Sequence, residues 1–206
     1  MKYYLILCIQ TLTNRGKMNM SNKPEFEKFN SLENSYRENF IHKIREQGGE
    51  NEKYIITEKL HGANYSFTVV IENGLPVSVT PAKRSGYINS DEKFYNHRPV
   101  YEKYVNKVSN LASYLLKDNN MSNGIVTVYG ELYGGNIQGG MAYPLEQDFA
   151  GFDITVDGTP IDKRKAFSLM NEYEIPTVPV LGYAKNLSEA LEWNESFTTK
   201  KLRDGF

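Results

Sequence analysis

The sequence has little cysteine, little histidine and almost no net charge, and each shortage excludes a class of protein. Cys8 is the only cysteine among 206 residues, so an internal disulfide framework is excluded and the chain fits a reducing compartment. The three histidines and this cysteine are widely separated and give no zinc-ligand spacing. The formal net charge of -1 provides no overall basic field, so any nucleic-acid surface must be local.

The sequence also lacks a long hydrophobic run. Residues 3–9 are apolar, but this stretch is far too short to span a membrane and no small-residue cleavage pattern follows it. We therefore predict no membrane partner, and we interpret residues 1–20 as an extension or upstream start outside the fold. Residues 21–206 are predicted to form the globular domain, and a hydrophobic content of 40% with 24% charged residues is typical of a soluble protein.

Hydrophobic patterning predicts both strands and helices, without the strand–helix–strand rhythm of a parallel sheet. Strands are predicted at residues 54–57, 65–71, 76–80, 125–129, 148–156 and 178–181, and helices at 31–47, 97–117, 163–173 and 187–193. Turns are predicted at Asn73-Gly74 and Asp157-Gly158, and Asn186 or Ser188 is expected to cap the last helix. The predicted fold class is therefore α+β, with antiparallel sheets and flanking helices.

One short stretch, residues 58–64, lies between two predicted strands and contains a candidate nucleophile, Lys59. A lysine at a strand end, followed by a turn at Gly62, holds its amine at a fixed point beside exposed backbone. A lysine amine that is stripped of water and surrounded by cations loses its proton more easily and becomes a nucleophile. The same residues also suit an ordinary hairpin with a solvated lysine, because a short motif is only a hypothesis.

Three further stretches stand out along the chain. Residues 83–86 combine two cations with a glycine turn, a pattern that is also typical of a solvated loop. Glu131 follows an apolar strand and is flanked by glycines, which suits either a pocket or a plain glycine-rich loop. Residues 148–156 are a further predicted strand, which contains Phe152.

Taken in order, these stretches resemble the nucleotidyltransferase motifs I, Ia, III and IIIa of ATP-dependent RNA ligases. The matching residues are 59–64, 83–86, 129–132 and 148–153, and residues 29–34 are similar to the opening segment of the same group. The group that the chain resembles is the bacteriophage RNA ligase 2 type, which includes the RNA-editing ligases. His61 stands at the third position of motif I, where DNA ligases and capping enzymes usually carry aspartate, and this favours an RNA ligase.

The resemblance implies an adenylation domain that uses ATP with Mg²⁺ or Mn²⁺. Lys59 would attack the α-phosphorus of ATP to form lysyl–AMP, AMP would pass to an RNA 5′-phosphate, and a 3′-hydroxyl would displace it. The implied partner is RNA, as a nicked duplex or as RNA ends, and the expected state is a monomer. The expected location is the cytoplasm, or the host cytoplasm if the protein is viral.

The resemblance also implies a role for each candidate residue. Arg84 would contact the sugar or phosphate edge of the nucleotide, and Glu131 would accept the ribose hydroxyl. Phe152 would stack on adenine, with Glu58 beside it, and the alternative for Phe152 is a place in the core, because phenylalanine is often buried. The residues expected to act near the phosphates in the later steps are His61 and Asn64. The resemblance assigns no metal ligand with certainty.

The resemblance stops near the last residues of the sequence. The family places an acidic residue and glycine at the start of motif IV, and Asp204-Gly205-Phe206 resembles that start, although members of this type more often carry glutamate. Asp204 would then organise the metal or water, while motif V and the C-terminal strands would be missing. We therefore expect a truncated domain that forms little lysyl–AMP by itself. The alternatives are a DNA ligase, a capping-type nucleotidyltransferase, or a catalytically impaired nucleotide- or RNA-binding fragment of the same fold.

Overall fold

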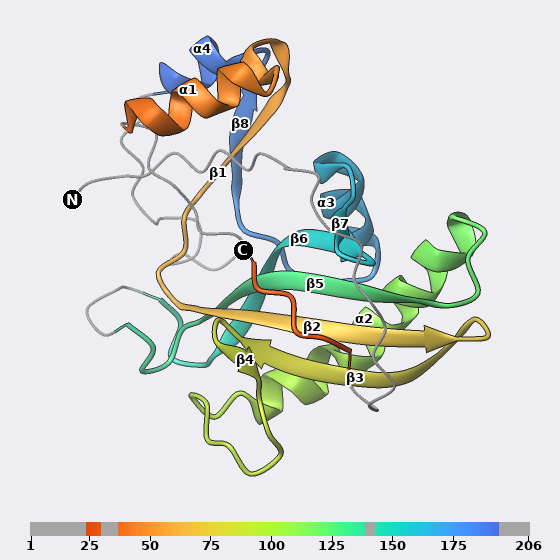
Figure 1. Ribbon diagram of the computed structural model, residues 1–206. Coiled ribbons are helices and arrows are strands. Elements are labelled where there is room, and N and C mark those ends of the chain that lie inside the picture. The colour runs from red at the N-terminus through yellow and green to blue at the C-terminus, as the bar shows by residue number, and fades with distance from the viewer. Residues whose placement is uncertain (1–23, 30–36, 139–142, 194–206) are drawn as a thin grey trace. The chain divides into compact units, whose positions relative to one another are not determined.

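The computed structural model describes residues 24–29, 37–138 and 143–193, which belong to two compact units (Figure 1). In the described part, the first unit contains residues 37–60 and 178–193, and the second contains residues 24–29, 61–138 and 143–177. Residues 1–20, interpreted above as an extension, lie outside the described part, and a single domain over 21–206 stays a prediction. Of the helices described, none combines the length and apolar character needed to cross a membrane.

The first unit is a two-stranded antiparallel sheet with helices beside it. Its elements are α1 (Glu38–Glu46), the 3-10 helix η1 (Gly49–Asn51), β1 (Tyr54–Thr57), β8 (Val180–Ala184) and α4 (Leu187–Leu191), and β1 pairs with β8. Asn186 caps α4, because its side chain accepts a hydrogen bond from the Glu189 N–H at 2.8 Å. The prediction that Asn186 or Ser188 fills this position is therefore confirmed for Asn186.

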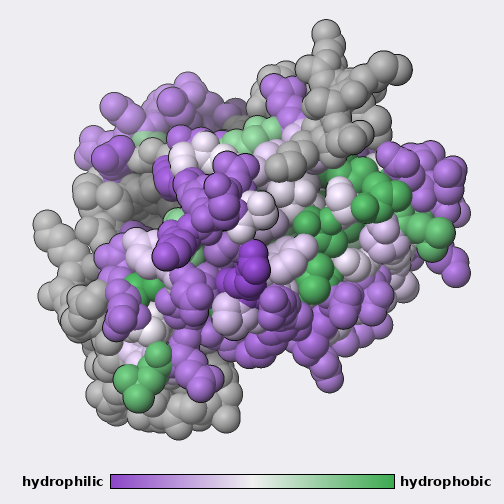
Figure 2. Space-filling model, turned by 90° about the horizontal axis from the view of Figure 1, so that it is seen from below, coloured by the Kyte–Doolittle hydropathy of each residue, from purple (hydrophilic) through white to green (hydrophobic). Residues whose placement is uncertain are grey.

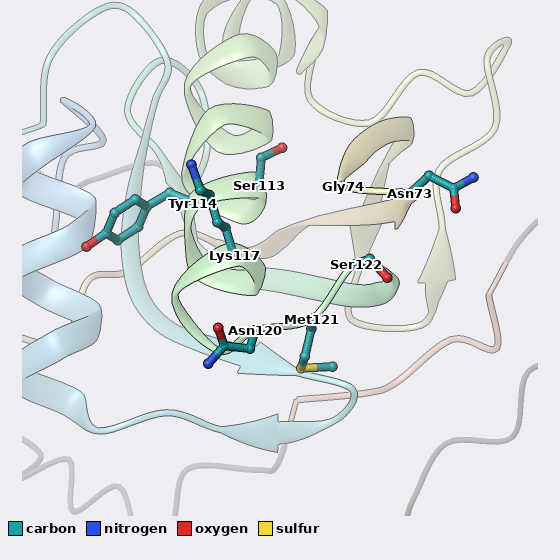
Figure 3. Close-up of a pocket in the computed structure, with 8 residues that line it drawn as sticks. All are labelled: Asn73, Gly74, Ser113, Tyr114, Lys117, Asn120, Met121 and Ser122. Carbon is teal, nitrogen blue, oxygen red and sulfur yellow. The ribbon is translucent and has the colours of Figure 1, made fainter.

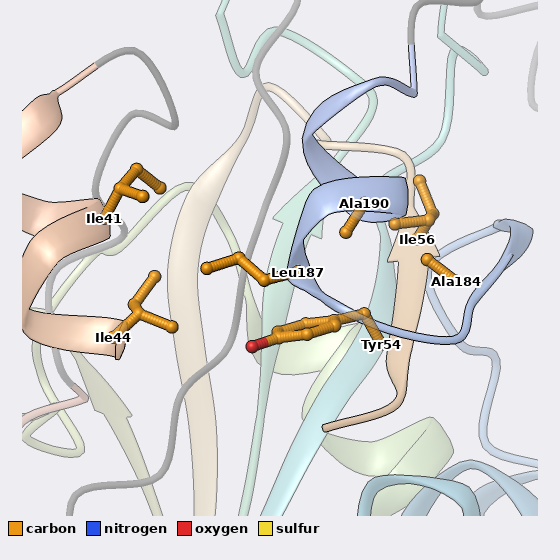
Figure 4. Close-up of a cluster of buried hydrophobic side chains, with 7 residues drawn as sticks. All are labelled: Ile41, Ile44, Tyr54, Ile56, Ala184, Leu187 and Ala190. Atoms are coloured by element: carbon orange, nitrogen blue, oxygen red, sulfur yellow. The ribbon is translucent and has the colours of Figure 1, made fainter. Parts of the chain in front are cut away.

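A small apolar core holds the first unit together (Figure 4). Its buried members are Ile41, Ile44, Tyr54, Ile56, Ala184, Leu187 and Ala190. The Tyr54 hydroxyl donates to the Gly49 carbonyl oxygen at 2.5 Å, so the buried phenol is satisfied. Each fully buried large apolar side chain contributes about 1.5–3 kcal/mol, and the core therefore ties α1 and α4 to the strand pair.

The second unit is a six-stranded antiparallel sheet in the order β4-β3-β2-β5-β6-β7. The strands are β2 (Ala63–Glu72), β3 (Leu75–Lys83), β4 (Gly86–Tyr87), β5 (Gly124–Tyr133), β6 (Asp148–Val156) and β7 (Thr159–Pro160). Helix α2 (Arg98–Asp118) packs against β2, β3, β5 and β6, and helix α3 (Lys163–Glu172) packs against β6. The resulting structure contains helices and antiparallel strands, as the sequence predicts.

The two faces of this sheet differ in chemistry. The β2 side chains Tyr65, Phe67, Val69 and Ile71 are all 0% exposed and lie on one face, because alternate strand residues point the same way. The intervening Ser66 and Thr68 lie on the other face and are buried polar residues. On that face the Thr127 hydroxyl donates to Thr68 across the β2–β5 pair at 3.4 Å. This second face therefore carries polar side chains that are buried inside the unit.

One face of the molecule is drawn in Figure 2, coloured by hydropathy. On the face drawn in Figure 2, hydrophilic side chains predominate and apolar ones gather in small areas. The exposed large apolar side chains include Leu75 (68% exposed) and Val77 (54%) on the first part of β3. Isolated exposed apolar residues of this kind are normal on a folded protein.

Several predicted elements are confirmed, and other predicted boundaries are wrong. β3 ends at Lys83 and not at residue 80, and β8 spans Val180–Ala184 and not residues 178–181. β1 and β6 have the predicted limits, and Asn73 and Gly74 have the positive φ angles, 52° and 79°, of the predicted hairpin turn. Of the predicted helix 31–47, residues 31–36 lie outside the described part. The prediction is wrong at Arg37, which is extended (φ -83°, ψ 103°), and α1 begins at Glu38. The predicted strand end near residue 129 is also wrong, because β5 continues to Tyr133 and pairs with both β2 and β6.

Candidate functional site

The first residues of the second unit, His61 and Gly62, are held by side chains from β5 and from the connection that follows it. The Gly62 N–H donates to Glu131 Oε1 at 3.1 Å, and the His61 N–H donates to Tyr143 Oη at 2.9 Å. The amide of Gln138 donates to the Gly62 carbonyl oxygen at 3.3 Å. The chain is therefore fixed immediately after the candidate nucleophile Lys59, which lies two residues earlier in the sequence.

The close approach of this loop to β5 requires glycine at position 62. A Cβ atom built on Gly62 would lie 2.2 Å from the Leu132 carbonyl oxygen and 2.8 Å from Glu131 Cγ. Both distances are far below van der Waals contact, so a side chain at this position displaces the loop or the strand. Glycine is thus needed at this position for a steric reason, which the sequence alone does not reveal.

The strand register brings several predicted site residues into one row across the sheet. Asn64 of β2 faces Glu131 of β5, and Glu131 faces Ala150 of β6. On the other edge of β2, Tyr65 pairs with Lys83. Because the strands are antiparallel, Arg84, the next residue along the chain, lies opposite Asn64. With strands about 4.8 Å apart, the row from Arg84 to β6 is about 14 Å long. Glu131 therefore lies inside β5, in contact range of Asn64, and not on the glycine-rich loop that was the alternative.

Phe152 lies close to this row, on β6, and its ring is only partly buried. Its ring centroid is 4.9 Å from that of Phe29, which in turn lies 5.0 Å from Tyr129. The Tyr129 hydroxyl donates to the Glu27 carbonyl oxygen at 3.1 Å, and burial raises the pKa of this phenol. Aromatic surface is thus available two residues beyond Ala150, and the partial exposure argues against a simple core role for Phe152.

The two cations of residues 83 and 84 have different surroundings. The Lys83 ammonium pairs with the Glu92 carboxylate and lies 6.0 Å from the centre of the Phe94 ring. This ion pair lowers the pKa of Glu92. Because Lys83 pairs with Tyr65 in the register, it shares the α2 side of the sheet, while Arg84 is exposed in the β3–β4 turn. Lys83 is therefore already neutralised by a carboxylate.

Glu58 and Lys59 belong to the first unit, immediately after β1. The Glu58 N–H donates to the Pro179 carbonyl oxygen at 2.9 Å, which fixes the backbone at this point. The Glu58 side chain is only 8% exposed, and burial raises its pKa. Among the described residues its Oε1 atom has no hydrogen-bond partner, so this buried acceptor is available to a donor from a ligand. Lys59 is partly buried.

The predicted site residues thus fall into three groups. The second unit brings together the residues near the row, which are His61, Asn64, Arg84, Glu131 and Phe152. The first unit holds Glu58 and Lys59, and Asp204 lies outside the described residues. In the described part, no three side chains of the His, Cys, Asp and Glu types gather as a metal site.

A surface hollow of about 620 Å³ lies at the far end of β2 (Figure 3). It is lined by residues of α2, of the segment after α2 and of the β2–β3 turn: Asn73, Gly74, Ser113, Tyr114, Lys117, Asn120, Met121 and Ser122. The ten residues of β2 separate this hollow from Gly62 by about 30 Å, at about 3.3 Å per residue. None of the predicted site residues lines it, and we assign it no part in the site.

Sequence reasoning missed the residues that support the site. Tyr143 and Gln138 lie 82 and 76 residues from their partners in the loop, and no local pattern connects them. Lys163 was also missed, although it pairs with the buried Asp153 at 2.6 Å. Here a signal existed, because an aspartate inside an apolar strand requires a cation or hydrogen-bond donors nearby.

Comparisons with known proteins agree with this geometry. The matching family model is described as RNA ligase and covers residues 52–205. The mitochondrial RNA-editing ligase 2 of Trypanosoma brucei brucei is 26% identical over 110 residues, which are 53% of this chain and 26% of that protein. The chain therefore spans about a quarter of the length of this curated relative.

Solved structures share the fold. A Naegleria gruberi RNA ligase mutant with ATP and Mn has a TM-score of 0.56 at 20% identity, covering 87% of this chain and 49% of that one. The same enzyme with PPi gives a TM-score of 0.56, again at 20% identity, with coverages of 85% and 49%. The α+β nucleotidyltransferase fold that the sequence predicts is thereby confirmed.

Proposed function

Since the chain belongs to the RNA ligase family, we propose that it joins RNA 3′-hydroxyl and 5′-phosphate ends through a lysyl–AMP intermediate formed from ATP. The observation that supports this most is the row formed by Asn64 on β2, Glu131 on β5 and the β3–β4 turn, because β2 is the strand that follows the candidate nucleophile. The neighbouring strand β6 carries Phe152 close to this row.

In the first step of this proposal, the Lys59 amine attacks the α-phosphorus of ATP. A nitrogen–phosphorus bond forms, the bond to the bridging oxygen breaks, pyrophosphate leaves, and the amine loses a proton to solvent. In the second step an RNA 5′-phosphate oxygen attacks the same phosphorus and releases Lys59. In the third step an RNA 3′-hydroxyl attacks the 5′-phosphorus, loses its proton, and AMP leaves.

Glu131 and Phe152 would bind the nucleoside. A carboxylate is a strong acceptor for a ribose hydroxyl, and Glu131 is already oriented by the Gly62 N–H at 3.1 Å. The partly exposed Phe152 ring provides a stacking surface for adenine. Glu58 would accept a hydrogen bond from the base, because its buried Oε1 lacks a partner among the described residues.

Arg84, His61 and Asn64 would act on the sugar and phosphates. The fixed fork of an arginine suits phosphate oxygens, and Arg84 is exposed at the register of Asn64. His61 is exposed at the start of the loop, with its backbone held by Tyr143. Asp204 would take part from beyond the described residues.

A divalent cation, Mg²⁺ or Mn²⁺, would neutralise charge on the ATP phosphates when bound. The described residues supply no ready-made set of three ligands, so we assign no metal ligand and derive no step through the ion. Magnesium is commonly held by substrate phosphates with only one or two carboxylates, which agrees with this arrangement.

The test of the proposal is transfer of AMP to the protein. The full chain is incubated with α-labelled ATP and a divalent cation and is analysed by denaturing electrophoresis, with Lys59→Ala beside it. Lys53→Ala is a matched control, because Lys53 is exposed just before β1. We expect an acid-labile label on the wild type and on Lys53→Ala, at the low yield expected from the sequence, and none on Lys59→Ala.

The outcomes separate this proposal from its rivals. Labelling with GTP in preference to ATP indicates a capping-type enzyme, and sealing of nicked DNA in preference to RNA indicates a DNA ligase. RNA affinity that is retained in Lys59→Ala, with no label on either protein, indicates a binding module and contradicts the proposal.

A further inference from the structure

The strand β6 contains a β-bulge, and Phe152 is its extra residue. In the register with β5, Tyr129 pairs with Asp153 and Gly130 pairs with Gly151, so no β5 residue faces Phe152. A bulge bends its strand and changes the direction of the side chain that it carries, and it occurs often beside active sites. The direction of the Phe152 ring therefore depends on what holds the bulge in shape.

Lys163 binds the backbone of the bulge. Its Nζ donates to the Phe152 carbonyl oxygen at 2.9 Å, and thus satisfies the carbonyl of the residue that has no partner on β5. On the preceding residue, the Gly151 N–H donates to the Pro176 carbonyl oxygen at 2.7 Å. Backbone groups at the bulge that do not pair with β5 therefore form hydrogen bonds with α3 and with the segment after it.

Lys163 also holds the next residue of the bulge. Its Nζ lies 2.6 Å from Asp153 Oδ2, and Asp153 is only 3% exposed. The other carboxylate oxygen, Oδ1, accepts from the Ile154 N–H at 3.0 Å. Burial raises the pKa of Asp153, while the neighbouring ammonium acts in the opposite direction and favours the ionised carboxylate. One ammonium thus bridges Phe152 and Asp153.

The position of Lys163 is itself fixed by the start of α3. Lys163 is the first residue of the helix, and the N-cap residue Asp162 accepts from the Lys165 N–H at 3.0 Å. The Lys163 side chain is mostly buried, at 20% exposure. The ammonium therefore sits on a rigid element and not on a mobile surface chain.

Tight packing leaves the bulge few alternative shapes. A Cβ atom built on Gly151 would lie 2.3 Å from the Met170 sulphur, and one built on Gly130 would lie 2.3 Å from the Phe149 ring. The backbone is thus closely packed at the Gly130–Gly151 pair, immediately before Phe152, whose ring remains partly exposed beside Phe29. Without Lys163 the least restrained part of the bulge is the Phe152 carbonyl.

We propose that Lys163 is a positioning residue for the nucleotide base: it holds the bulge so that the Phe152 ring meets adenine at a fixed angle. This inference rests on the proposed function. Lys163 acts through Phe152 and touches neither the phosphates nor the reacting atoms. Its loss therefore weakens binding of the base and leaves the chemistry at phosphorus intact.

The test compares Lys163→Met with Lys163→Arg and with Lys165→Met. Methionine keeps the length of the side chain but removes the charge and the donors, and arginine restores both. Lys165 is the matched control, because it lies on the same helix turn and forms its ion pair at 2.7 Å with Asp118 on the surface. Binding of ATP and of inorganic tripolyphosphate is measured by calorimetry, and the adenylylation rate is measured against ATP concentration.

For Lys163→Met we expect about a tenfold weaker affinity for ATP, equivalent to about 1.4 kcal/mol and within the range of one base–aromatic stack. Affinity for tripolyphosphate, which has no base, should stay within twofold. KM should rise about tenfold while kcat stays within twofold, Lys163→Arg should recover most of the loss, and Lys165→Met should match the wild type. Combining Lys163→Met with Phe152→Leu should cost no more than Phe152→Leu alone.

Several results would overturn the inference. Equal losses for ATP and tripolyphosphate, or additive losses in the double variant, would show that Lys163 only stabilises the fold. Wild-type ATP affinity in Lys163→Met would refute the inference and leave the proposed function intact, whereas a folded wild type that binds no ATP refutes both. If Lys163→Met does not fold, Asp153→Asn replaces it, because it removes the ion pair that holds the Lys163 ammonium beside the Phe152 carbonyl. It should weaken ATP binding selectively, and equal weakening for tripolyphosphate contradicts the inference.

Discussion

Replacing Gly62 by alanine tests how closely the motif I loop approaches β5. The new Cβ would lie 2.2 Å from the Leu132 carbonyl oxygen and 2.8 Å from Glu131 Cγ. β5 is paired on both edges, with β2 and with β6, so its backbone has little freedom to retreat. The loop must move instead, and its movement breaks the 3.1 Å hydrogen bond from the Gly62 N–H to Glu131.

Two costs contribute to the expected destabilisation. Inserting an extra methyl group into a packed contact costs about 1–3 kcal/mol. Losing a hydrogen bond to a charged group costs about 1.5–3 kcal/mol when water does not replace it, and Gly62 is partly exposed, so water offsets some of this loss. We expect the free energy of unfolding to fall by about 2–3 kcal/mol, which lowers Tm by about 4–12 °C for a chain of this length.

Gly74→Ala is the matched control at the other end of β2. A Cβ on Gly74 meets nothing within 4 Å, but its φ of +79° is unfavourable for alanine. This variant should lose about 1–2 kcal/mol through backbone strain alone. Urea unfolding measures the stability of both variants, and ATP labelling measures their adenylylation. Gly62→Ala should label at least tenfold more slowly than Gly74→Ala. Equal labelling of the two variants, with Gly62→Ala within 0.5 kcal/mol of the wild type, would refute the close approach.

Two further predictions concern hydrogen bonds in the second unit. Tyr143→Phe removes the acceptor for the His61 N–H, which is exposed, so we expect the free energy of unfolding to change by less than about 0.5 kcal/mol. ATP labelling should slow several-fold relative to the control variant Tyr114→Phe. Equal labelling rates in the two variants would contradict a role for the Tyr143 hydroxyl. His97 bonds to the Tyr65 hydroxyl at 2.9 Å, and burial, aided by Arg98 and opposed by Glu92, lowers its pKa. The unfolded chain therefore takes up this proton first, and the free energy of unfolding should decrease as pH falls below about 6.5. Urea titrations from pH 8 to pH 5 should show a shallower decrease in His97→Gln, and parallel curves would contradict the assignment.

The sequence predicts elements whose periodicity matches their burial. The five residues that define one side of the predicted helix 97–117 are all buried in α2: Val100, Tyr104, Val108, Leu111 and Leu115. The start of α1 was less predictable, because apolar spacing alone does not distinguish a helical turn from an extended approach such as that of Arg37. Periodicity therefore gives the existence of an element more reliably than its ends.

The sequence names the candidate site residues, and it does not reveal the residues that support them. Asn64 and Glu131 belong to motifs that can be recognised in the sequence, but only the strand register shows that the two residues face each other. The bulge at Phe152 depends on how β6 pairs with β5 and on Lys163 from the next helix, which are tertiary facts. Hydrophobic patterns report which residues are buried, and they do not report such offsets in pairing.

The pairing of β2 with β5 has a consequence for when the site first exists during folding. β2–β3 and β5–β6 are neighbours along the chain, whereas the contact between Gly62 and Glu131 closes a loop of 69 residues. Contacts between distant residues form late, because the entropy of closing a long loop must be overcome first. A nascent or partly folded chain can thus contain both strand pairs and still lack the proposed nucleotide site.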